Sequence, residues 1–165
     1  VFETEVYGLG VWFPLVFGMI AACMSFSSFV NARLVRKIGM HKISHIALFI
    51  MTASSLINVL IAIWFDGQPP LLLFGIGLTT ILFCFSLTMP NFNSLAMEPV
   101  GAIAGTASSM IGVYSTLIGV IAGGIIGQQF NGTVIPLLAG YFVLGLIAIV
   151  IVGITERGKF CHATH

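Results

Sequence analysis

The sequence predicts an all-α membrane protein that crosses a bilayer about five times. Of its 165 residues, 58% are hydrophobic and 7% are charged, whereas about 25% are charged in soluble domains. The mean hydropathy is +1.12, and no Asp, Glu, Lys or Arg occurs from Pro99 to Thr155. That uncharged segment alone can hold two spans of about 20 residues each. We therefore expect a lipid bilayer to be the solvent of this chain.

Five apolar stretches without charge are expected to form the spanning helices. They cover residues 9–30, 43–65, 71–97, 100–127 and 134–154. Barrel strands are not expected, because such strands need only about ten residues of alternating polarity. A helix also satisfies its backbone hydrogen bonds within one segment, as hydrocarbon requires.

The first stretch carries small residues on one predicted helical face, and a basic segment follows it. The small residues are Gly18, Ala21, Ser25, Ser28 and Ala32. The basic segment, predicted to be a loop, contains Arg33, Arg36, Lys37, Gly39 and Lys42. The two other cations, Arg157 and Lys159, lie near the C-terminus. Since Lys and Arg concentrate on the cytoplasmic side, we expect a cytoplasmic C-terminus and an N-terminus outside.

Histidines stand in pairs at the start of the second stretch and in the C-terminal tail. His41 and His45 share a predicted helical face, and His162 and His165 lie in the tail. Neither pair has a plausible third ligand. We therefore expect surface or interface histidines and no metal site.

Polar side chains follow one face of the third stretch. With its apolar neighbours this face comprises Thr80, Phe83, Cys84, Leu87, Thr88 and Asn91. Polar groups in membrane helices make interhelical hydrogen bonds or line cavities, and both interpretations remain open. Pro90 removes one backbone hydrogen bond, as often happens where a membrane helix bends around a site. A second polar face carries Thr79, Ser86 and Asn93.

The fourth stretch carries a longer ridge of small residues at helical spacing. Its members are Ser108, Gly112, Thr116, Gly119, Gly123 and Gly127. Such ridges let helix backbones approach closely in lipid. Fixed helix packing is one interpretation, and a moving contact between two halves of a transporter is the other.

The charge pattern argues against several functions. Nucleic-acid binding needs clustered cations, whereas this chain has six Lys and Arg and a net charge of +1. Every acidic residue lies at the end of an apolar stretch or in a loop, so no proton-relay carboxylate is expected within the spans. No catalytic arrangement and no phosphate-cradling glycine loop stands in a suitable context. We expect no enzymatic activity and no cofactor.

Two segments resemble the major facilitator superfamily. The stretch from Ala32 to Lys42 is similar to the short basic loop of that superfamily, in the form found in the C-terminal half. The stretch from Asn91 to Ser109 resembles the junction of the tenth and eleventh helices in Bcr/CflA-type drug efflux proteins. Val6-Tyr-Gly and residues 127–133 add to the likeness. The resemblance implies the eighth to twelfth helices of a twelve-helix fold, with the N-terminal portion missing.

This resemblance also implies a function. It implies multidrug efflux at the inner (plasma) membrane by proton antiport, with protons and a small amphipathic substrate as partners. The N-terminal half of the same transporter would complete the substrate cavity, to which the 71–97 helix contributes. Residues 119–127 look like a weakened antiporter glycine motif, and two positions depart from the family pattern, Ala102 and the run from Gly10 to Phe13.

Two alternatives come from other classes. A truncated, non-transporting membrane module or gene remnant would show the same hydropathy. An intramembrane enzyme would need polar catalytic residues gathered at one depth, and the positions of the acids and histidines disfavour it.

Overall fold

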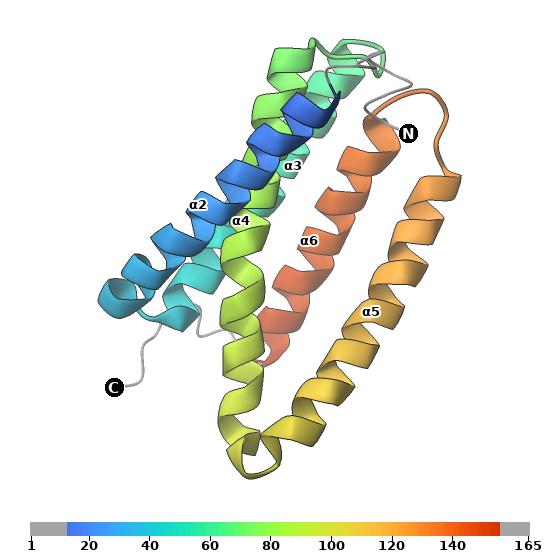
Figure 1. Ribbon diagram of the computed structural model, residues 1–165. Helices are drawn as coiled ribbons and strands as arrows, with labels where there is room; N and C mark the ends of the chain where they lie inside the picture. Colours follow the sequence, from blue (N-terminus) through green and yellow to red (C-terminus); the bar gives the residue numbers. More distant parts are fainter. Residues whose placement is uncertain (1–12, 156–165) are drawn as a thin grey trace.

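The computed structural model describes residues 13–155, which form five long α-helices and one short 3-10 helix (Figure 1). Their bounds are α2 Phe13–Ile38, α3 Met40–Trp64, α4 Leu71–Met97, η2 Glu98–Ile103, α5 Ala104–Gln128 and α6 Ile135–Thr155. All five α-helices are long and apolar enough to span a membrane. The predicted fold class, an all-α membrane protein of about five helices, is confirmed.

The helix bounds follow the apolar stretches most closely for α4, whose predicted and observed residues are the same, 71–97. The start of α5 differs, because the chain after Met97 first forms η2, with a non-helical Val100 inside it. The helix predicted from residue 100 therefore begins at Ala104.

The basic segment is not a loop. α2 continues to Ile38 instead of ending at residue 30, so Arg33, Arg36 and Lys37 lie on α2, and Lys42 lies on α3. α2 continues beyond the last apolar residue of the predicted stretch. The cations Arg36 and Lys37 in its last turn interact favourably with the helix dipole. The Arg33 guanidinium also lies 4.6 Å from the ring centre of Phe29.

Gly39 alone separates α2 from α3, and its backbone requires a glycine. Its φ is 87° and its ψ is 153°, a region that is essentially restricted to glycine. Its amide donates to the carbonyl of Val35, and its carbonyl accepts from the amide of Ile43. The chain therefore reverses direction here without a longer connection.

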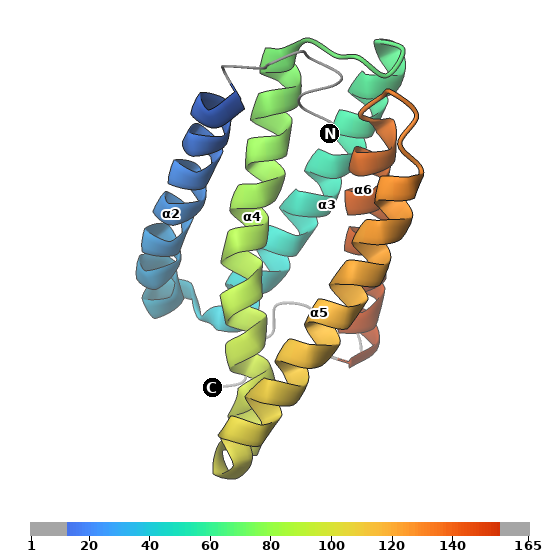
Figure 2. The same cartoon turned by 45° about the vertical axis from the view of Figure 1, so that its right-hand side comes forward.

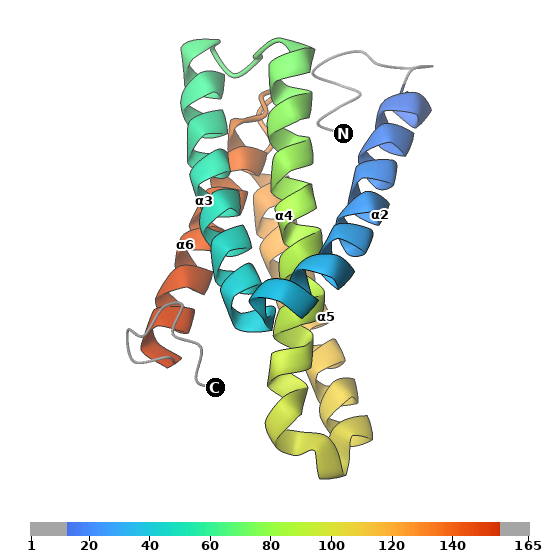
Figure 3. The same cartoon turned by 90° about the vertical axis from the view of Figure 1, so that its left-hand side faces the viewer.

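The packed core lies among α3, α4 and α6, with α2 on the free side of α4 (Figures 2 and 3). Its buried apolar residues include Ala47, Leu48, Phe74, Ile81 and Leu138. Two glycines allow close approach within this core. A Cβ at Gly77 would overlap the Asn58 side chain of α3, and one at Gly145 would press on Thr52.

Two connections are joined at the end of the bundle opposite Gly39. The amide of Val134 donates to the carbonyl of Gly67 over 3.1 Å, which links the α5–α6 connection to the α3–α4 connection. Gly67 has a φ of 86°, and a Cβ there would overlap Thr133. The connections therefore alternate between the two ends, as expected for successive crossings (Figure 1).

α5 stands apart from this core. None of its residues is buried, and it lies along the side of α6 while its start adjoins the end of α4 (Figure 2). Side chains as large as Tyr114 and Ile118 are exposed on it.

Candidate functional site

The predicted polar stripe of α4 faces neighbouring helices. Cys84, Leu87, Thr88 and Asn91 are buried, and the Thr88 hydroxyl donates to the carbonyl of Cys84 within its own helix over 2.8 Å. Such a bond satisfies a hydroxyl group that has no water available. These four side chains are therefore covered by neighbouring helices of the described bundle.

Asn91 lies in a polar seam between α4 and α2. Its amide donates to Oδ1 of Asn31 over 2.7 Å, and the amide of Asn31 approaches Oδ1 of Asn91 at 3.4 Å. The Asn91 amide also donates to the carbonyl of Leu87. A paired amide of this kind holds two membrane helices together.

Two hydroxyl groups extend the seam. The Ser27 hydroxyl donates to the carbonyl of Phe83 over 3.1 Å, and the Ser86 hydroxyl donates to the carbonyl of Met24 over 3.3 Å. Ser27 is buried, although the sequence did not single it out. For this face of α4, the geometry favours interhelical packing over cavity lining.

Three further predicted residues lie outside the buried part of the stripe. Thr80 and Phe83 are half-buried, and Pro90 is exposed. The Thr80 hydroxyl donates to the carbonyl of Ile76 within its own helix. Thr80 therefore has its hydroxyl hydrogen-bonded locally.

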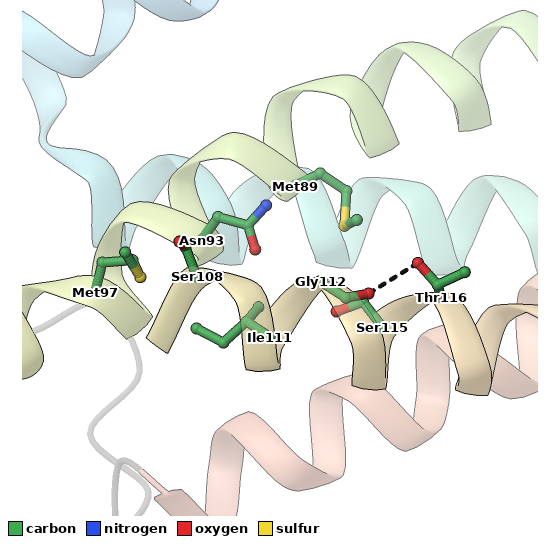
Figure 4. Close-up of a pocket in the computed structure, with 8 residues that line it drawn as sticks. All are labelled: Met89, Asn93, Met97, Ser108, Ile111, Gly112, Ser115 and Thr116. Atoms are coloured by element: carbon green, nitrogen blue, oxygen red, sulfur yellow. Dashed lines mark hydrogen bonds between the residues drawn. The ribbon is translucent and has the colours of Figure 1, made fainter. Parts of the chain in front are cut away.

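A pocket of about 320 Å³ lies between α4 and α5, on a different face of α4 (Figure 4). It is lined by Met89, Asn93, Met97, Ser108, Ile111, Gly112, Ser115 and Thr116. The α4 residues recur every four positions, and the α5 residues recur every three or four, so each set occupies one helical face. The 3-10 turn η2 brings these two faces together at one end of the bundle.

The polar groups of this pocket differ in what they offer a ligand. The Thr116 hydroxyl donates to the carbonyl of Gly112, and the Ser108 hydroxyl donates to the carbonyl of Gly105. No hydrogen bond within residues 13–155 uses the amide of Asn93 or the hydroxyl of Ser115. The pocket therefore presents a free amide and a free hydroxyl between apolar walls.

Sequence reasoning found part of this pocket. Asn93 stood on the second polar face of α4, and Ser108, Gly112 and Thr116 stood on the small-residue ridge of α5. The sequence did not identify four further lining residues, Met89, Met97, Ile111 and Ser115. Their spacing of three or four positions from the predicted residues places them on the same helical faces.

The ridge glycines of α5 have open space around them. A Cβ added at Gly112, Gly119, Gly123 or Gly127 would meet nothing within 4 Å. Close packing of this ridge is therefore not found in the described bundle. A contact with another part of a transporter stays a prediction.

The described residues hold no group of three His, Cys, Asp or Glu that could bind a metal ion. The rings of His41 and His45 lie 6.3 Å apart, and His45 is buried 6.4 Å from the ring of Phe92. His45, which belongs to α3, thus packs against α4. His162 and His165, like Arg157, Lys159 and residues 1–12, lie outside the described residues.

Comparison with known proteins gives one informative similarity. Over 146 residues, the chain is 30% identical to a bicyclomycin resistance protein homolog of Haemophilus influenzae. The aligned region covers 88% of this chain and 35% of the relative, so the chain spans about a third of the relative's length. No protein-family profile and no solved structure matches the chain. The chain is thus a multi-pass membrane protein with similarity to a drug-resistance protein.

Proposed function

We propose that this chain is part of a secondary active transporter that exports small drugs or metabolites, and that it belongs to the Bcr/CflA type of the major facilitator superfamily. The observation that carries the proposal is the 30% identity over 146 residues to a bicyclomycin resistance protein homolog. The segment from Asn91 to Ser109, which resembles that family, joins α4 to α5. It also supplies Asn93, Met97 and Ser108 to the pocket.

The geometry supports transport in two ways. The α4–α5 pocket combines apolar walls with a few polar groups, as small-molecule sites do. The small residues of α2 and α5 also remain exposed, for example Gly18 and Gly119. We infer that the N-terminal half of the same transporter covers these faces, because small residues favour close helix contacts in lipid.

Proton antiport belongs to the same proposal. Among the described residues, Asp66 and Glu98 are the acidic ones, and both lie outside the α-helices. A coupling carboxylate inside the membrane would therefore come from the N-terminal half. We infer that the pocket contributes substrate contacts and that the other half contributes the proton site.

Export also requires an orientation. We infer that the chain lies in the inner membrane with its C-terminus in the cytoplasm. The support is that Arg33, Arg36, Lys37 and Lys42 gather at one end of the bundle, and basic residues mark the cytoplasmic side.

The proposal is tested by export from living cells. The complete reading frame containing this chain is expressed in bacteria that lack their own exporters, and accumulation of bicyclomycin is measured. We expect lower accumulation than with an empty vector, and restored accumulation after a protonophore removes the proton gradient. The second condition separates proton-driven export from export driven by ATP.

A non-transporting membrane module is the alternative, in which the exposed face of α5 would pack against another membrane protein. Correct membrane insertion with unchanged accumulation of bicyclomycin and of a panel of other drugs would support this alternative. A stop codon directly before Val1 in the gene would do the same.

A further inference from the structure

We propose that the α4–α5 pocket selects uncharged amphipathic ligands that carry an amide or hydroxyl group, with Asn93 as the residue that determines this specificity. The proposal rests on the transport function proposed above and deepens it by naming the chemical class of the ligand. Four observations carry it: the pocket lining has no charged side chain, the Asn93 amide is free, the methionine walls are flexible, and open space remains at Gly112.

The lining carries no charged side chain. Glu98 follows Met97 in the chain, but it lies on η2, is exposed and does not line the pocket. A charged ligand entering the pocket would lose hydration without gaining a counter-ion there. An uncharged ligand of the same shape avoids that cost, so the pocket favours the uncharged ligand.

Asn93 supplies the directional contact. Its side chain offers two N–H donors and a carbonyl acceptor, and it projects from α4 into the space beside Ser108 (Figure 4). Ser115 adds a hydroxyl from α5 on the same pocket wall as Gly112. A ligand amide or hydroxyl can donate a hydrogen bond to the Asn93 carbonyl and accept one from its N–H groups. A quaternary ammonium group can neither donate nor accept a hydrogen bond.

Met89 and Met97 stand one helical turn on either side of Asn93 and form the apolar walls. Methionine side chains are unbranched and polarizable, so they adapt to ligands of different shape. Met89 is 41% exposed, which leaves it room to move. The apolar body of a ligand would therefore lie against thioethers while its polar group reaches Asn93.

Gly112 lines the pocket and leaves open space at its own position. A Cβ added there would meet nothing within 4 Å, so a larger side chain would enter the empty space. The volume of about 320 Å³ lies at the lower end of the range for small-molecule sites. The variant Gly112→Leu should therefore exclude a ligand from the pocket without disturbing the packed core.

The test uses two probes of the same shape. One is N-(biphenyl-4-ylmethyl)acetamide, which is uncharged, and the other is (biphenyl-4-ylmethyl)trimethylammonium, which is a permanent cation. Their dissociation constants are measured by isothermal titration calorimetry on the 165-residue chain in lipid nanodiscs. We expect the amide to bind at least ten times more tightly than the cation.

Four variants locate the binding. Asn93→Ala should weaken amide binding about five- to tenfold, as expected for one lost hydrogen bond, and should leave cation binding unchanged. Asn93→Asp should raise the affinity for the cation. Gly112→Leu should abolish binding of the amide, whereas Gly119→Leu, on the same ridge but outside the pocket, should retain it.

Equal binding of the two probes, or parental amide affinity in both Asn93→Ala and Gly112→Leu, would overturn the proposal. So would failure of the parent chain to bind the amide. Gel filtration and the thermal midpoint of each variant verify that it is folded, and Asn93→Leu, which has a similar volume and no donor or acceptor, replaces Asn93→Ala if the latter is not. Amide binding without bicyclomycin export would refute transport alone, and export that is indifferent to Gly112→Leu would refute the pocket alone.

Discussion

At the residue scale, two glycines of α4 show how strongly the surroundings decide a residue's role. Gly75 and Gly77 are separated by one position in the same helix. A Cβ at Gly75 would meet nothing within 4 Å, whereas a Cβ at Gly77 would overlap the amide group of Asn58. Asn58 is itself buried and donates to the carbonyl of Ser54 over 2.7 Å.

Gly77→Ala should destabilise the bundle by about 1–3 kcal/mol, the usual cost of overpacking a core. Gly75→Ala is the matched control, and it should be neutral or slightly stabilising because alanine favours helix more than glycine does. Unfolding in mixed detergent micelles, followed by circular dichroism, measures both. Equal stability of the two variants would show that α3 and α4 do not meet at Gly77.

The backbone of Gly39 gives a second prediction at this scale. Gly39→Ala forces a side chain into a backbone region that costs about 1–3 kcal/mol for other residues. Gly18→Ala, at a helical position with open space, is the control and should not lower stability. The same unfolding measurement applies, and an undiminished midpoint for Gly39→Ala would contradict the connection described between α2 and α3.

Which glycines are used for packing could not be predicted from the sequence. The ridge of Gly112, Gly119, Gly123 and Gly127 was conspicuous by its spacing, yet a Cβ added at any of these glycines would meet nothing within 4 Å in the described bundle. Gly77 and Gly145 have no such pattern. Their importance comes from the helix opposite them, and a single sequence does not show which helices meet.

At the element scale, the polar seam between α2 and α4 is the feature to test. Asn31→Ala and Asn91→Ala should each destabilise the bundle, and the double variant should cost less than the sum. The coupling energy should be about 0.6 kcal/mol, with about 1.7 kcal/mol as an upper value for such bonds in membranes.

A double-mutant cycle in detergent measures this coupling. Ser25→Ala is a suitable control, because the Ser25 hydroxyl is exposed and donates to the carbonyl of Ala21 in its own helix. Strictly additive effects of Asn31→Ala and Asn91→Ala would mean that the amide pair does not form in the membrane.

The extents of the elements were largely predictable, and the exceptions have physical reasons. Hydropathy locates the part of a helix that fits hydrocarbon, which is why 71–97 was predicted correctly. It does not detect a helix that continues beyond the hydrocarbon, as α2 does through Arg33 and Lys37. Hydropathy locates the break at Glu98 and Pro99, but it does not detect that the 3-10 turn continues to Ile103, because Val100–Ile103 is uncharged and apolar.

At the scale of the whole molecule, orientation is the property that an experiment can decide directly. In a background where the native cysteines are replaced, Gln68→Cys should react with an impermeant maleimide in intact spheroplasts. Lys37→Cys should react only after permeabilisation, because basic residues favour the cytoplasmic side. The reverse labelling pattern would show that the basic residues lie outside the cytoplasm, and it would contradict the orientation proposed for export.

The candidate site was predictable in its parts but not in its assembly. Periodicity placed Asn93 on one face of α4 and Ser108, Gly112 and Thr116 on one face of α5. Only the structure shows that these faces meet, because η2 fixes the angle at which α5 leaves α4. The stripe that includes Asn91 seemed the stronger cavity candidate from polarity alone, but Asn91 is hydrogen-bonded to α2.

The single-residue connection at Gly39 has a consequence for movement. Because the single residue Gly39 joins α2 to α3, the ends of these helices at Gly39 form a pivot and cannot separate. A tilt of α2 is then converted into a sideways displacement that grows along the helix and is greatest at the opposite end. In a transporter, such a lever would open the end of the bundle opposite Gly39 while the Gly39 end stays closed.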